Sequence, residues 1–393
     1  MNIIYFVNYY PPNTGAAALN SSKIIKKKKK FGHSVLVLRP FDMAKSFNTN
    51  KALSKKSNVH VSSSLIKFPF SRVFSHLENI IAYLLNLKKK INPDLIMSQY
   101  HAFHYASVAG AYVSKKLNVP HVIRSHDIFH DLSIHSLPYR IYNSMIYPRI
   151  FNSISKSELF YVVSSELRDY LLQMKKISHT KIKVHHNGID VSEFYPKHYQ
   201  NSLKEKFSCE NIILFIGLIN ESIGLHHFVN SLSNVLKTRK ETHLVIIGDG
   251  PYRDEVLNIV NQTGISNQVH FLGIMSHEKI PYFINNCDIG VGRITSDKLW
   301  TYSIPIKCLE YMACKKPFIT TPLSRDVIFK NDVGLTLKRD FNDQDVIDKL
   351  TLLIENPKLR NKLGENGFLK IQKRFSWDKV MREYNDDLLE ITQ

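Results

Sequence analysis

Two charged residues, Lys307 and Glu310, lie three positions apart in a segment that predicts a turn, a helix and a strand. Pro305 suits the first turn of a helix, where its missing N–H costs no hydrogen bond. A helix N-terminus attracts anions, so Lys307 adds to an anion site that the backbone already makes. Glu310 could accept hydrogen bonds from a vicinal diol. The pair would fit a phosphate beside a ribose; the alternative is an (i, i+3) surface pair worth a few tenths of a kcal/mol.

The composition bounds the class of protein. The chain has 393 residues, 44% of them hydrophobic, which predicts two or three domains and excludes a disordered chain. No apolar run approaches the roughly 18 residues of a membrane helix, and Met1–Pro12 lacks the basic start and cleavage site of a signal peptide. We therefore expect a cytoplasmic protein. Four cysteines without CxxC spacing predict reduced core thiols: Cys209, Cys287, Cys308 and Cys314.

The positive charge is concentrated in the first half of the chain. Residues 1–195 contain 27 Lys and Arg against 10 Asp and Glu, a net +17, and the remainder has 53 − 27 = 26 against 34 − 10 = 24, a net +2. Such polarity indicates an anionic surface that meets one domain only, either nucleic acid or the cytoplasmic face of a membrane. We find no aromatic and basic interleaving typical of a nucleic-acid-binding module.

Two lysine runs could contact such a membrane. Lys26–Lys30 end a predicted helix, and Lys88–Lys90 follow a segment within Phe70–Lys90 whose apolar residues recur at helical spacing. An amphipathic helix with a basic end can lie on a bilayer. The alternative is core packing with solvated helix ends.

Apolar segments of strand length alternate with predicted helices in the first half. This alternation is typical of a parallel, doubly wound α/β sheet. The predicted strands are Asn2–Val7, Ser34–Leu38, Asp94–Ser98, His121–Ser125, Leu159–Ser165 and Ile182–Asn187. Ligands of such sheets bind just beyond the carboxyl ends of the strands. His126, with Arg124 and Asp127 beside it, falls at one of these ends and is a candidate active-site group; a surface or structural histidine is the alternative.

A second alternation of strands and helices follows a turn and linker at Asn187–Pro196. Its predicted strands are Ile212–Gly217, His243–Pro251, Val269–Gly273, Asp288–Gly292 and Pro317–Thr320. Gly248–Pro251 ends a strand where backbone N–H groups could face a phosphate, but it lacks the GxGxxG spacing of a dinucleotide site. The single DxD match, Asp343–Asp345, begins a polar helix, and we treat it as chance.

The order of these motifs resembles the retaining glycosyltransferases of family 4, which have the GT-B fold of two Rossmann-like domains facing a cleft. The resemblance spans nearly the whole chain. The matching motifs are YYPPNTG at Tyr9–Gly15, Gly32 with His33, His126, NGxD at Asn187–Asp190, Gly248–Pro251, FLG at Phe271–Gly273, EYMAxxKPxI at Glu310–Ile319, LGENG within Ile354–Gly367, and FSW at Phe375–Trp377.

The resemblance implies a nucleotide-sugar in the cleft, held mainly by the second domain. Glu310 would bind the ribose hydroxyls, Gly15 would let backbone N–H groups meet the donor phosphate, and His126 would act on the donor sugar as the catalytic group. The implied donor-binding set also includes Ser303, Ile306, Lys307 and Gly250. Lys307 and helix N-termini would stabilise the departing diphosphate, so no metal or other cofactor is expected.

The chain departs from the common family pattern at three positions. Tyr302 stands where the family has a first Glu, eight positions before Glu310, and Leu218 and Ile223 replace the phosphate-binding Arg and Lys between Gly217 and Gly224. A subgroup of surface-polysaccharide transferases carries PxKxxEYMA, which this chain matches at Pro305–Ala313. Lys307 could therefore supply one of the lost charges.

We therefore expect a retaining glycosyltransferase that moves a sugar from a nucleotide donor to a polyprenyl-linked or growing glycan acceptor. Capsule, O-antigen or other surface polysaccharide would be the product, made at the inner face of the cell membrane. The alternatives are a sugar-nucleotide epimerase of the same fold and a catalytically degenerate relative. The predicted domains are 1–195 and 196–375, with a final helix at 376–393 that packs back on the first domain.

Overall fold

The computed structural model of the protein describes most of the chain. The described residues are 1–7, 16–39, 59–61, 92–100, 106–125, 148–173, 181–200, 202–295, 301–327 and 331–393. They form two compact units. Unit 1 comprises Met1–His186 with Val380–Gln393, and unit 2 comprises Asn187–Lys379.

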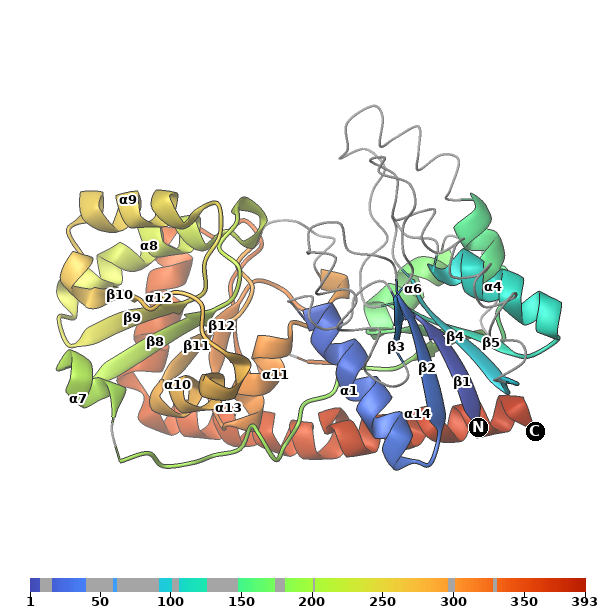
Figure 1. Ribbon diagram of the computed structural model, residues 1–393. Helices are drawn as coiled ribbons and strands as arrows, with labels where there is room; N and C mark the ends of the chain where they lie inside the picture. Colours follow the sequence, from blue (N-terminus) through green and yellow to red (C-terminus); the bar gives the residue numbers. More distant parts are fainter. Residues whose placement is uncertain are drawn as a thin grey trace. The chain divides into compact units, whose positions relative to one another are not determined.

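Unit 1 is built on a parallel sheet of seven strands in the order β3-β2-β1-β4-β5-β6-β7 (Figure 1). The strands are β1 (Asn2–Phe6), β2 (Ser34–Arg39), β3 (Val59–Val61), β4 (Leu95–Tyr100), β5 (His121–Ser125), β6 (Leu159–Val162) and β7 (Ile182–Val184). The helices with described bounds are α1 (Ala16–Lys30), α4 (Ala106–Leu117) and α6 (Ser165–Gln173). Because β1 lies between β2 and β4, the strand order reverses there, as in a doubly wound sheet.

The apolar runs of the first half become buried strands. Every residue of β4, β5 and β6 is buried, which fits parallel strands covered on both faces. On one face, Ile4, Phe6 and Ile96 pack against Ala109 and Val113 of α4. The predicted α/β class is therefore confirmed for this unit.

Unit 2 repeats the plan with a parallel sheet of six strands in the order β10-β9-β8-β11-β12-β13 (Figure 1). The strands are β8 (Asn211–Ile216), β9 (Thr242–Ile247), β10 (Val269–Phe271), β11 (Ile289–Val291), β12 (Phe318–Thr320) and β13 (Gly334–Thr336). The helices are α7 (Leu203–Phe207), α8 (Leu225–Thr238), α9 (Arg253–Thr263), α10 (Ile280–Asn286), α11 (Ile306–Ala313), α12 (Asp343–Glu355) and α13 (Pro357–Lys370). Short 3₁₀ turns lie at η4 (Glu221–Ile223), η5 (Ser266–Gln268) and η6 (His277–Lys279), and a π turn, η8 (Ile371–Phe375), precedes α14 (Trp377–Thr392).

Alternate residues of β8 belong to two different hydrophobic cores. Ile213 and Phe215 belong to the core beneath α8, α9 and α12, whereas Ile212 and Leu214 belong to the core that includes residues of α10 and α11. This alternation follows from the two-residue period of a strand. All four cysteines are buried and free, as the sequence predicted.

Helix α11 lies unusually close to β11. A Cβ at Gly290 would come within 2.5 Å of the Tyr311 ring, and the Tyr311 hydroxyl donates to the carbonyl of Leu214 at 2.9 Å. The buried hydroxyl is thereby satisfied, and the ring locks α11 over the sheet. This contact fixes where the side chains of the first turns of α11 lie.

The boundary between the units falls between His186 and Asn187, before the predicted boundary at Tyr195. The NGID segment belongs to unit 2 because the Ile189 N–H donates to the Phe375 carbonyl at 2.8 Å and the Ile189 carbonyl accepts from the Trp377 N–H at 3.0 Å. Phe194 joins the same core. Residues from Val380 onward group with unit 1, where Asn385 contacts the ring of His33 at 2.5 Å.

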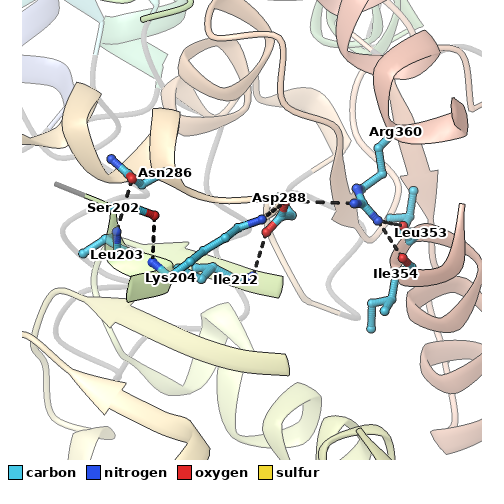
Figure 2. Close-up of polar contacts among 9 residues, drawn as sticks. All are labelled: Ser202, Leu203, Lys204, Ile212, Asn286, Asp288, Leu353, Ile354 and Arg360. Carbon is cyan, nitrogen blue, oxygen red and sulfur yellow. Dashed lines mark hydrogen bonds and ion pairs between the residues drawn. The ribbon is translucent and has the colours of Figure 1, made fainter. Parts of the chain in front are cut away.

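A charged cluster at the amino-end edge of the unit 2 sheet is shown in Figure 2. Asp288 accepts from Lys204 at 2.8 Å and from the Ile212 N–H at 2.8 Å, and its carboxylate lies 4.0 Å from Arg360. Arg360 also donates to the carbonyls of Leu353 and Ile354, at the end of α12. This cluster ties α7, β8, β11 and α13 together.

None of the helices in the described ranges is both long and apolar enough to span a bilayer. The segment Phe70–Lys90, with Lys88, Lys89 and Lys90, lies outside the described residues.

Candidate functional site

The candidate site lies at the carboxyl-end edge of the unit 2 sheet. All six strands are parallel, so the segments that follow them emerge at one edge. Helix α11 begins at Ile306, directly after Pro305. Lys307 and Glu310 therefore occupy its first two turns, as the sequence predicted.

Glu310 is buried, with 4% of its surface exposed. Its Oε1 lies 2.9 Å from Nε2 of His277, which comes from turn η6 after β10. Among the described residues this is the one hydrogen bond of the carboxylate, so a second oxygen is left to accept from a ligand. No sequence pattern pointed to His277, because 33 positions separate it from Glu310.

Lys307 reaches across to the end of β8. Its Nζ lies 4.0 Å from the centroid of the Phe215 ring, and a Cβ at Gly217 would lie 3.5 Å from the same atom. Removal from water lowers the pKa of Lys307 to about 7, and the positive charge of Arg293 acts in the same direction. The ammonium group is therefore held on an aromatic face, at the edge where ligands of such sheets bind.

Arg293 is another cation at this edge, and it was not among the residues predicted from the sequence. It follows β11, and one of its terminal nitrogens donates to the hydroxyl of Ser303 at 2.6 Å. Ser303 was a predicted donor-binding residue; the structure places its hydroxyl on Arg293, just before α11. The sequence did carry one signal for Arg293: it is a basic residue two positions after β11, the strand that precedes α11.

The glycines of the Gly248–Pro251 motif allow two loops to approach closely. A Cβ at Gly248 would lie 1.9 Å from the Gly217 carbonyl oxygen, and one at Gly250 would lie 2.2 Å from that of Ile219. Both glycines also have positive φ, 137° and 158°, which side chains disfavour. The structure thus gives Gly250 a packing role beside the loop that follows β8, and its contact with a donor stays a prediction.

Leu218 and Ile223 occupy the loop between β8 and α8, at the positions where the family that this chain resembles has Arg and Lys. Leu218 is 57% exposed, and Ile223 lies partly buried against the α8 side of the core. Ile306 is half-buried at the first position of α11. The loop itself therefore carries no cation at either family position.

Three predicted residues of the first domain, Gly15, His126 and Asp127, lie outside the described residues. Arg124 is described, and its supporting role beside His126 stays a prediction. It is 1% exposed, and it bonds to the His185 ring and to the His186 carbonyl. Its guanidinium thus links β5 to the segment after β7 inside the core of unit 1.

The predicted membrane contact of Lys28 is wrong. Lys28 is 1% exposed, and its Nζ lies 4.1 Å from the centroid of the Tyr384 ring. Burial lowers its pKa to about 7, with the Arg124 charge acting in the same direction. The reason is helical periodicity: Lys28 shares the inward face of α1 with Ile24 and Ile25. The rest of the run is exposed (Lys26, Lys29, Lys30) or half-buried (Lys27).

Comparisons with known proteins agree over both halves of the chain. Residues 200–370 match the sequence pattern "Glycosyl transferases group 1", and residues 25–193 match "Glycosyltransferase Family 4". An uncharacterized glycosyltransferase of Methanocaldococcus jannaschii is 26% identical over 376 residues, which is 95% of this chain and 93% of that protein.

Another relative has a named activity. The N,N'-diacetylbacillosaminyl-diphospho-undecaprenol alpha-1,3-N-acetylgalactosaminyltransferase of Campylobacter jejuni is 25% identical over 319 residues, covering 77% of this chain and 79% of that protein. Among solved structures, Anabaena HepE in complex with UDP has a TM-score of 0.79 at 18% identity and covers 99% of this chain and 100% of that chain. That likeness shows the fold, which is GT-B with two Rossmann-like domains.

Proposed function

The chain belongs to the group 1 glycosyltransferases of family 4, and we propose on this basis that it transfers a sugar from a nucleotide donor with retention at the anomeric carbon. The observation that carries the proposal is the placement of Lys307 and Glu310 on the first turns of α11, at the carboxyl-end edge of the unit 2 sheet. An ammonium and a partly satisfied carboxylate there match a phosphate and a ribose.

The donor in this proposal is a nucleoside diphosphate sugar. Departure of the diphosphate builds negative charge, which preorganised donors stabilise best in a site shielded from water. Lys307 and the N-terminus of α11 provide such donors without a metal ion. Glu310 accepts from the ribose while His277 fixes the orientation of its carboxylate. UDP is the nucleotide bound by Anabaena HepE, so UDP-sugars are the first donors to test.

A thermal-shift panel of UDP-, GDP- and dTDP-sugars tests this assignment. At least one donor is expected to stabilise the wild-type protein, and Glu310→Ala and Glu310→Gln are expected to reduce that stabilisation by more than half. Each variant is compared with its own ligand-free melting temperature, so loss of the His277 contact does not confound the result. Glu255→Ala, an exposed glutamate of α9, is the control. Equal donor stabilisation of wild type and both Glu310 variants would contradict the assignment.

We further propose a polyprenyl-linked or growing glycan acceptor of surface polysaccharide synthesis, met at an anionic membrane. Support comes from the net +17 of residues 1–195, from the exposed Lys26, Lys29 and Lys30, and from the diphospho-undecaprenol in the name of the Campylobacter relative. Each basic residue near an anionic surface adds about 1 kcal/mol of attraction.

Vesicle co-sedimentation tests the membrane part. The protein is expected to pellet with anionic vesicles, to stay in solution with zwitterionic ones, and to be released at high salt. The triple variant Lys26→Glu, Lys29→Glu, Lys30→Glu should lose most of this binding, whereas Lys237→Glu with Lys240→Glu in unit 2 should not. Salt-independent failure of the wild type to bind would remove the membrane from the proposal.

A further inference from the structure

A pocket of about 390 Å³ lies in unit 1 between α4 and the helical segment 148–155. Strands β4, β5 and β6 are neighbours in that order, so right-handed crossovers place these two connecting helices side by side on one face of the sheet. The pocket reaches His121, the first residue of β5. It therefore includes the amino end of this strand, whereas the substrates of such sheets bind beyond the carboxyl ends.

The described residues that line this pocket include three cations and no acid. Lys115 comes from the last turn of α4, Arg149 belongs to the segment 148–155, and Lys156 directly follows that segment. The side chains of Lys115 and Lys156 are exposed, and neither forms an ion pair or a hydrogen bond with the described part of the chain. Glu158, the acidic residue nearest to Lys156 in the sequence, does not line the pocket. The positive charge of the two lysines is therefore available to an anion.

His121 is the most deeply buried residue of the pocket, with 2% of its surface exposed. Its Nε2 lies 2.8 Å from the hydroxyl of Ser98, a buried residue of β4. That hydroxyl has no other partner among the described residues, so it donates to Nε2 and leaves the ring proton on Nδ1. Nδ1 is buried and has no partner within the described ranges. It is a donor that needs an acceptor, which a ligand of the pocket would supply.

The ring of His121 is held in one position. Gly110 on α4 lets it lie close to the helix, since a Cβ there would come within 2.6 Å of Nε2. Burial lowers the pKa of His121 to about 3, so the imidazole is neutral near pH 7 and donates through one nitrogen. A donor fixed in this way loses little conformational freedom when it binds a ligand.

The pocket is larger than an inorganic ion requires. Its volume of about 390 Å³ falls within the range of small-molecule sites, roughly 300 to 1,000 Å³. Tyr112 lines it with a ring that is 48% exposed, a flat surface on which a carbon skeleton can rest. Asn152 adds an exposed amide that can bond to a hydroxyl group. The ligand that fits these groups is an anion with a small polar organic part.

We propose that this pocket binds a phosphate monoester, whose oxygens lie between Lys115, Lys156 and the Nδ1–H of His121. A phosphate monoester carries about two negative charges near neutral pH, which two ammonium groups match, and its oxygens accept from a neutral N–H. Ser98 is a positioning residue, because its hydroxyl sets the tautomer of His121. The alternative is that the lysines only favour the C-terminal ends of their helices and that a water molecule accepts from Nδ1.

Isothermal titration with glycerol 3-phosphate at constant ionic strength tests the proposal. Wild-type protein is expected to bind it, and Lys115→Gln combined with Lys156→Gln should lower the affinity about 10- to 30-fold, as for two lost contacts with charged groups. Dimethyl phosphate, a diester with a single negative charge, should bind at least about five-fold more weakly than the monoester.

Three variants serve as controls and refine the result. Lys116→Gln makes the same change at the same helix end, but Lys116 does not line the pocket, so the affinity should change less than about two-fold. Lys307→Met should also leave the affinity unchanged, which excludes binding at α11. Ser98→Ala should lower the affinity about two- to five-fold without lowering the stoichiometry, which reports the folded fraction.

Vesicles distinguish two sources of the phosphate monoester. Phosphatidic acid presents on a lipid the monoester that glycerol 3-phosphate presents in solution, whereas phosphatidylglycerol is a diester. If the ligand is a lipid headgroup, the double lysine variant should lose binding to phosphatidic acid vesicles and keep most of its binding to phosphatidylglycerol vesicles. If the ligand is a free metabolite, the variant should lose only its affinity for glycerol 3-phosphate. Either result supports the pocket.

The inference fails if wild-type protein neither binds glycerol 3-phosphate nor prefers phosphatidic acid vesicles, or if Lys116→Gln loses as much affinity as the double variant. Both outcomes leave the proposed function standing, because the sugar donor binds in unit 2. Loss of glycerol 3-phosphate binding in Lys307→Met would also overturn the inference, since the anion would then lie at α11.

Discussion

The charged side chains at the two edges of the unit 2 sheet have different kinds of partner. At the amino-end edge, Asp288 lies between Lys204 and Arg360, so unlike charges meet (Figure 2). At the carboxyl-end edge, Lys307 lies on the Phe215 ring and Arg293 bonds to a serine hydroxyl. One edge holds its lysine in an ion pair, and the other holds its lysine on an aromatic face. The comparison teaches that the partner of a charged side chain, more than the presence of charge, distinguishes the two edges.

Asp288→Ala is expected to have the largest effect, on stability. It would leave Lys204 and the Ile212 N–H without their acceptor, in a place where the Asp288 side chain is 14% exposed. The Lys204 side chain is 37% exposed, so most of the cost comes from the buried groups that lose their acceptor, up to about 3 kcal/mol. Urea unfolding should show this loss, while donor affinity per folded molecule stays unchanged. Glu355→Ala, which removes an exposed partner of Arg239, should cost at most about 0.5 kcal/mol. A similar loss in both variants would break the comparison.

Lys307→Met is expected to act on binding instead. Methionine keeps the apolar contact with Phe215. Loss of the charge should lower the affinity for the nucleoside diphosphate about 30-fold, or about 2 kcal/mol. Isothermal titration measures this loss. Stability at neutral pH should not fall, because a costly desolvated charge is removed. A destabilised variant with normal affinity would mean that Lys307 supports the fold and does not bind the diphosphate.

The pH dependence sharpens the same contrast. The pKa of Lys307 is about 7 in the folded protein against an ordinary 10.5, so between these values the unfolded chain binds the extra proton. Stability should therefore rise with pH across this window, whereas diphosphate affinity should fall as the ammonium is lost. Lys307→Met should flatten both profiles. Lys28→Met is the matched control, since Lys28 has a pKa of about 7 in unit 1: it should flatten only the stability profile.

Leu218→Arg is expected to give the smallest effect, a gain. Leu218 is 57% exposed, so an arginine fits without repacking and restores the family charge. An added solvent-exposed charge is worth up to about 1 kcal/mol, roughly a five-fold gain in diphosphate affinity. Leu218→Gln separates charge from polarity and should show no gain. A loss of affinity in Leu218→Arg would mean that the diphosphate lies elsewhere on this edge.

Local patterns predicted much of the fold and part of the site. Strand–helix alternation indicated two parallel sheets, and the helix after Pro305 carries Lys307 and Glu310 as expected. Lys28 shows the limit of the same reasoning. A run of five lysines suggests that all five are exposed, but in a packed helix one residue in three or four faces the core, as Lys28 does. Which groups pack against that face depends on the rest of the fold.

By itself, the sequence determined the fold class, the family and the pair on α11, because periodicity, turn residues and motif spacing are local properties of the chain. Tertiary structure alone decided which distant groups join that pair: His277 meets Glu310 from η6, and Arg293, which follows β11 beside β8, is near enough to lower the pKa of Lys307. The physical reason is that a parallel sheet brings the carboxyl ends of its strands to one edge, and no local pattern encodes which residues will then be neighbours.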